Sequence, residues 1–168
     1  MDDDFLDEFK LSKKAQKKLK NKKQLKKEFS QGHTPQEIIG YSNETMAKFY
    51  GAAYHLFENR HYKDASDAFL FLVTLNAYNH DYWLGLGMSS QMCGDFDLAV
   101  DAYELAAICN MENPVPYFYL AKCLFAMHDR DSALQALELA IEYSHDTPDF
   151  ADLKKQALAA QTLLKKHG

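Results

Sequence analysis

The chain has no apolar run approaching the roughly 20 residues that are needed to cross a bilayer. Its N-terminus is acidic and then rich in lysine, without the apolar centre of a cleaved signal peptide. Cysteine is also scarce, since Cys93, Cys109 and Cys123 have no C-x-x-C spacing and three thiols cannot all pair with one another. These features favour free thiols in a reducing compartment, so we expect a cytoplasmic protein.

Motifs for catalysis and cofactor binding are missing as well. The segment "WLGLG" holds Gly85 and Gly87, but the third glycine of a dinucleotide-binding loop would fall on Ser90. The seven histidines lack H-E-x-x-H spacing, the cysteines form no metal-ligand cluster, and no nucleophile has an identifiable base. We therefore predict no catalytic residues, no bound metal, no cofactor and no enzymatic activity.

Charge is distributed unevenly along a chain of 168 residues with a net charge of −5. Residues 1–28 hold ten lysines and six acidic residues, a charge of +4, which leaves −9 on the remainder. Leu11, Leu19 and Leu25 are too sparse for a continuous apolar stripe, so residues 1–33 are predicted to be a solvated, flexible tail, partly helical or disordered. Contact of this tail with nucleic acid or an anionic membrane is the less favoured alternative, since clustered lysines gain from counterion release.

The chain matches itself when it is shifted by 34 residues, the period of the tetratricopeptide repeat. Bulky and small positions agree without a gap: Phe49, Trp83 and Tyr117; Ala52, Leu86 and Leu120; Ala53, Gly87 and Ala121; Ala65, Ala99 and Ala133; Phe69, Tyr103 and Leu137; Leu72, Ala106 and Ala140. The pattern predicts an all-α fold in which three repeats form a short right-handed superhelix with flanking helices.

The same alignment explains the glycines of "WLGLG". Two antiparallel helices pack closely only where a small residue faces a bulky one, so Gly87 is predicted to pack against a large side chain such as Tyr103. Gly94 lies in the turn between the two helices of the second repeat, where a positive φ is expected. Its counterparts are Arg60 and His128, so looser turns are predicted there.

The repeats are placed at residues 46–79, 80–113 and 114–147 of a domain spanning 34–168. Their helices are expected near residues 46–58, 62–75, 80–92, 96–109, 114–126 and 130–143. A short helix at 34–41 should precede them, and a lysine-faced capping helix at 148–166, with Thr147 as N-cap, should follow.

The first helices of stacked pairs line the concave side of such an array. Positions 2, 5, 9 and 12 of each repeat should face this groove: Ala47, Tyr50, Tyr54 and Phe57; Asp81, Leu84, Met88 and Gln91; Val115, Phe118, Lys122 and Phe125. A groove so rich in apolar side chains favours an extended segment with hydrophobic side chains as its ligand. Alternatively, the N-terminal helix, a dimer partner or repeat-to-repeat packing buries these aromatics.

Several segments resemble the class II chaperones of bacterial type III secretion, which hold translocator proteins before export. They are "SNETMAKFYGAAYHLFENRHYKDASDAF", "DYWLGLGMSSQMCGDFDLAVDAYELAAICNMENPVPYFYLAKCLF" and the final helix. The resemblance implies that a P-x-L-x-x-P-like client segment lies on Tyr50, Tyr54, Phe57 and Tyr62, with Tyr103 near the client. It also implies a homodimer formed through residues 34–41, with Ile38, Ile39 and Tyr41 at the interface.

Two other kinds of binding protein remain as alternatives. A repeat adaptor that captures a C-terminal carboxylate would use lysines such as Lys48 and Lys122, but the neighbouring groove positions are aromatic. The lysine-rich tail is the second alternative, and deleting residues 1–28 would separate it from a groove-bound client.

Overall fold

The computed structural model describes residues 12–167, and all regular secondary structure in that range is helical. The helices are α2 (Lys13–Lys20), α3 (Lys22–Ser30), α4 (Pro35–Ile39), α5 (Asn43–Glu58), α6 (Tyr62–Leu75), α7 (His80–Met92), α8 (Phe96–Cys109), α9 (Val115–Ala126), α10 (Arg130–Ser144), a 3-10 turn η1 (Pro148–Phe150) and α11 (Ala151–Lys166). The predicted all-α fold is confirmed.

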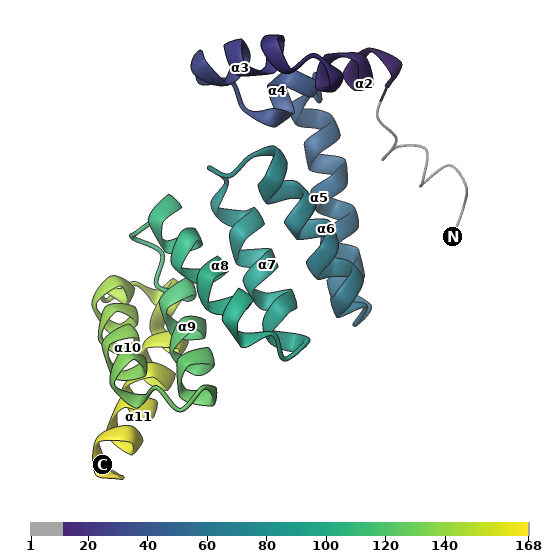
Figure 1. The fold of residues 1–168 in the computed structure, drawn as a ribbon. Coiled ribbons are helices and arrows are strands. Elements are labelled where there is room, and N and C mark those ends of the chain that lie inside the picture. Colours follow the sequence, from purple (N-terminus) through teal and green to yellow (C-terminus); the bar gives the residue numbers. More distant parts are fainter. Residues whose placement is uncertain (1–11, 168) are drawn as a thin grey trace.

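Consecutive helices form antiparallel pairs that stack along the chain, from α5 and α6 through α9 and α10 (Figure 1). The first helices of successive pairs also touch, since α5 contacts α7 and α7 contacts α9, and α11 continues the series against α9. This arrangement brings the predicted groove positions of separate repeats onto neighbouring helices.

The buried side chains form two clusters along the stack. The first joins α5, α6 and α7 around Phe49, Phe69 and Leu86. The second joins α8 to α11 around Tyr103 and Leu137. Burial of such side chains is worth about 1.5–3 kcal/mol each, so the repeats are held by their contacts with one another rather than by isolated helices.

The three turns inside the repeats share one backbone geometry. Arg60, Gly94 and His128 have φ of 64°, 79° and 65°, and their N–H groups donate to Phe57, Gln91 and Phe125 respectively, each at 3.0 Å. The prediction of looser turns at Arg60 and His128 is therefore corrected. Helix packing on both sides fixes the left-handed conformation even where the residue has a side chain.

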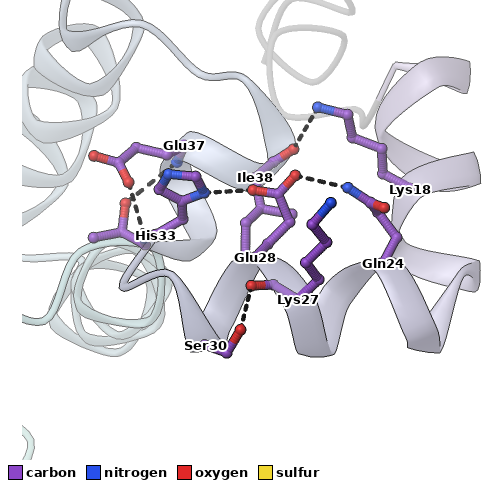
Figure 2. Close-up of polar contacts among 9 residues, drawn as sticks. Lys18, Gln24, Lys27, Glu28, Ser30, His33, Glu37 and Ile38 are labelled. Carbon is purple, nitrogen blue, oxygen red and sulfur yellow. Dashed lines mark hydrogen bonds and ion pairs between the residues drawn. The ribbon is translucent and has the colours of Figure 1, made fainter.

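The lysine-rich segment, which was expected to be a partly helical or disordered tail, contains two helices, α2 and α3. Ser12 caps α2 by accepting a hydrogen bond from the Ala15 N–H, and Ala15 is buried. The Lys18 ammonium group donates to the Ile38 carbonyl at 3.2 Å, which ties α2 to α4 (Figure 2). Residues 1–11 of the predicted tail, and Gly168, lie outside the described residues.

The C-terminal helix begins later than predicted. Residues 148–150 form a 3-10 turn, and the Thr147 hydroxyl donates to the Ser144 carbonyl at 3.1 Å instead of capping the helix. The α-helix starts at Ala151, and Ala157 is buried against the second cluster. The Arg130 guanidinium donates to the Leu164 carbonyl and so joins α10 to α11.

Candidate peptide-binding groove

Four aromatic side chains form a continuous row on the first repeat. Tyr50, Tyr54 and Phe57 follow one face of α5, and Tyr62 begins α6. Their ring centroids are 6.2 Å apart for Tyr50 and Tyr54, 6.5 Å for Tyr54 and Phe57, and 5.4 Å for Phe57 and Tyr62. Tyr54 is 45% exposed and the other three are half-buried, so the row offers aromatic surface to a ligand.

The base of this row is fixed by packing. Tyr50 lies 6.0 Å from Phe69 and 5.8 Å from Tyr82, measured between ring centroids. Burial raises the pKa of Tyr50, and the carboxylate of Asp81 raises it further. The phenol therefore stays protonated and can donate a hydrogen bond to a ligand carbonyl at neutral pH.

The second repeat contributes an aliphatic middle section. Leu84 and Met88 on α7 are half-buried and pack against the second cluster. Gln91, the last predicted groove position of this helix, accepts a hydrogen bond from the Tyr103 hydroxyl at 2.7 Å. Its side-chain oxygen is thereby engaged within the chain.

The third repeat and α11 line an open cavity of about 330 Å³. Phe118, Lys122 and Phe125 come from α9, and Phe125 is 56% exposed. The Lys122 ammonium lies 4.6 Å from the Phe118 ring centroid and 5.2 Å from that of Tyr119. This cation–π placement keeps its methylenes along the aromatic surface and its charge at the rim.

The opposite wall of this cavity was not predicted. It is made by Gln156, Ala160, Leu163 and Leu164 of α11. The lysines of this helix suggested only a solvating cap, although Ala157, Ala160 and Leu164 recur at the three- and four-residue spacing of a helical face. That spacing was the feature of the sequence that could have indicated a packed apolar face on α11.

Tyr103 differs from its predicted place beside the client. Its side chain is fully buried, stacks on Tyr119 with centroids 5.9 Å apart and lies against Gly87. Burial raises the pKa of Tyr103. The residue supports the groove from behind rather than lining it.

The predicted dimer residues pack within the chain. Ile38 is buried, and Ile39 and Tyr41 are partly buried against the first cluster. The Tyr41 ring meets Phe49 edge-on at 5.4 Å between centroids. Of these three side chains, Ile39 and Tyr41 have exposed parts that a second copy of the chain could contact.

The described residues contain no group of three or more histidine, cysteine or acidic side chains placed to hold a metal ion. No helix between residues 12 and 167 has the length and apolar content of a membrane span.

Known proteins share both the sequence and this architecture. A tetratricopeptide-repeat family model matches residues 93–157. Low calcium response locus protein H of Yersinia pseudotuberculosis is 31% identical over 124 residues, which cover 74% of each chain. The chain belongs to the tetratricopeptide-repeat chaperones of type III secretion.

Two further relatives agree with this assignment. The chaperone protein SicA of Salmonella dublin is 29% identical over 136 residues, covering 81% of this chain and 80% of SicA. The Yersinia enterocolitica chaperone SycD, solved in complex with a peptide of the translocator YopD, superposes with a TM-score of 0.73 at 28% identity. The match covers 75% of this secretion chaperone and 96% of SycD.

Proposed function

We propose that this chaperone holds an extended, apolar segment of a translocator protein in its concave groove before export. Binding there would mask client segments that otherwise aggregate or meet their partners too early. The proposal places the protein in the bacterial cytoplasm and gives it no chemical step, in keeping with relatives that are named as chaperones.

The aromatic row from Tyr50 to Tyr62 carries this proposal. Four rings in mutual contact, one of them 45% exposed, form a surface on which apolar side chains of a bound segment can pack. SycD with a YopD peptide, and PcrH with the chaperone-binding region of PopD, are solved complexes of similar chains with translocator segments.

The cavity between α9 and α11 offers a second anchor point. Its volume of about 330 Å³ and its apolar walls suit one or two client side chains, while Lys122 at the rim suits a client carbonyl or carboxylate. Three apolar anchors give about 5–9 kcal/mol gross. Ordering an extended peptide offsets several kcal/mol, so micromolar affinity is expected for a short segment.

Anisotropy titration of a labelled P-x-L-x-x-P-type peptide from a candidate translocator tests the proposal. The Tyr54→Ala/Phe57→Ala variant should bind at least tenfold more weakly, because each truncation removes aromatic contact area. The matched control is Tyr78→Ala/Ile108→Ala, which removes two exposed apolar side chains from a loop and from α8, outside the predicted groove positions.

The control should bind as the parent does, and circular dichroism should show that both variants remain folded. Equal affinity of the parent and the groove variant would refute the assignment of the client site. A matching loss in the control would point to diffuse hydrophobic binding instead.

A homodimer through residues 34–41 stays part of the proposal. The related SycD has been solved as an alternative dimer. Sedimentation of the parent and of an Ile39→Asp variant would test it, because a charge on this half-buried side chain opposes its burial between two copies.

A further inference from the structure

Helices α2 and α3 concentrate positive charge on one end of the molecule. Residues 12–30 contain nine lysines and a single acidic residue, Glu28, a charge of +8. The Glu28 carboxylate pairs with His33 and accepts a hydrogen bond from Gln24 at 3.0 Å (Figure 2). The ion pairs of the described residues include none of these lysines. The Lys18 ammonium donates to the Ile38 carbonyl, and the charges of the other eight are available to a partner.

The neighbouring acidic stretch does not cancel this charge. Five of the six acidic residues in the first 28 lie at positions 2–8, and residues 1–28 still carry +4. The rest of the chain carries −9. A negatively charged partner is therefore attracted to this end of the molecule and repelled by the rest.

Apolar side chains lie among the lysines of α3. Leu25 and Phe29 are one turn apart, and Phe29 is 54% exposed. Lys22 stands three residues before Leu25, and Lys26 stands three residues before Phe29, so both lysines lie on the adjoining strip of the helix. Exposed Leu19, at the end of α2, adds to the apolar surface.

This combination fits a membrane surface better than a nucleic acid. Lysine side chains reach lipid headgroups while a neighbouring aromatic ring enters the boundary of the acyl chains. The Asn21 side chain accepts a hydrogen bond from the Gln24 N–H, and the Gln24 side chain donates one to Glu28. These two amide groups, which could otherwise read bases, are therefore engaged within the chain. Residues 12–30 contain no arginine, the usual residue for bidentate contact with guanine.

We propose that α2 and α3 dock on an anionic lipid surface, with lysines over the headgroups and Phe29 and Leu19 at the interface. The two helices lie together at the end of the stack away from α11 (Figure 1). Docking through that end would leave the later repeats directed away from the lipid. The inference is independent of what the groove binds.

Vesicle flotation of the full chain tests this proposal. Vesicles of phosphatidylcholine with about 30% phosphatidylglycerol should bind the protein, whereas vesicles of phosphatidylcholine alone should not. The reason is that each lysine near an anionic surface is expected to raise the affinity about fivefold. Replacing Lys22, Lys23, Lys26 and Lys27 by Gln should weaken binding at least tenfold. The matched control replaces the exposed Lys48, Lys155, Lys165 and Lys166 by Gln and should bind as the parent does.

A Phe29→Ala variant separates membrane docking from general polyanion binding. Loss of the ring should weaken vesicle binding by about tenfold, since burial of Phe contributes to it. Binding of the parent to polyuridylate under the same conditions is measured in parallel. The proposal would be overturned if the parent failed to bind the vesicles, or if binding fell equally in the lysine control. It would also be overturned if Phe29→Ala left vesicle binding unchanged and the parent bound polyuridylate more tightly than vesicles.

Discussion

Gly87 lies so close to Tyr103 that a Cβ atom on the glycine would be 2.7 Å from the Cδ1 and Cε1 atoms of the ring. The ring is fully buried and stacked on Tyr119, so it cannot move aside. Gly87→Ala should therefore destabilise the protein by about 1–3 kcal/mol in urea unfolding.

Gly51 provides the matched control for that substitution. It also lies within a helix, but no atom stands within 4 Å of a Cβ built on it. Gly51→Ala should stabilise the protein by about 0.5–1 kcal/mol, because alanine favours the helix. A stable Gly87→Ala protein would contradict the close contact between α7 and α8.

The turns at Arg60 and His128 should gain from glycine. Both residues have positive φ, which costs a residue with a side chain about 1 kcal/mol, while Gly94 adopts the same conformation freely. Arg60→Gly and His128→Gly should each raise the free energy of unfolding by up to about 1 kcal/mol. Gly94→Ala should lower it by a similar amount, and the opposite ordering would rule out this account.

His61 precedes α6 without a capping hydrogen bond, unlike its counterparts. Asp95 and Asp129 accept from the N–H groups of Leu98 and Ser132 at 3.3 and 3.1 Å. The backbone at His61 is similar, with φ −83° and ψ 63° against −84° and 76° at Asp95. His61→Asp should stabilise the protein by about 1 kcal/mol at pH 7, with His61→Ala as the control that adds no cap.

The cap at Asp129 should make stability depend on pH. Hydrogen bonds from the Ser132 side chain and backbone hold the pKa of Asp129 below its usual range. The folded pKa is thus below the unfolded value of about 3.9, so this stabilisation is present above that pH and is lost as pH falls through the folded pKa. Asp129→Asn keeps a capping oxygen but removes the titration.

Urea unfolding of parent and Asp129→Asn at pH 7, 5 and 3 measures this effect. The difference in stability should hold between pH 7 and 5 and shrink at pH 3. A difference that stays constant down to pH 3 would show that the cap does not depend on the charge.

The three cysteines should differ in reactivity. Burial raises the pKa of Cys123 to about 11 and also raises that of Cys109, whereas Cys93 is exposed. At pH 8, Ellman's reagent should label Cys93 rapidly, Cys109 slowly and Cys123 only after unfolding. Cys93→Ser should remove the fast phase, and rapid labelling of Cys123 in the native protein would disprove its burial.

Much of the helical framework follows from the sequence because the 34-residue period repeats both packing and turn positions. The ranges expected at 62–75, 80–92 and 96–109 coincide with α6, α7 and α8. The small residue at Gly87 predicts a large neighbour, and Gly94 predicts a positive φ. Each of these features depends on the spacing of residues close together in the chain, which can be read from one sequence.

The tertiary structure decided which surface each aromatic faces. The family resemblance implied that Tyr103 lies near a client, but its packing against Gly87 of α7 and Tyr119 of α9 buries it. The packing of α11 on α9 creates the second anchor cavity, and the packing of α2 on α4 orders lysines that sequence alone left as a tail. Such contacts join residues far apart in the chain, so periodicity within one repeat does not specify them.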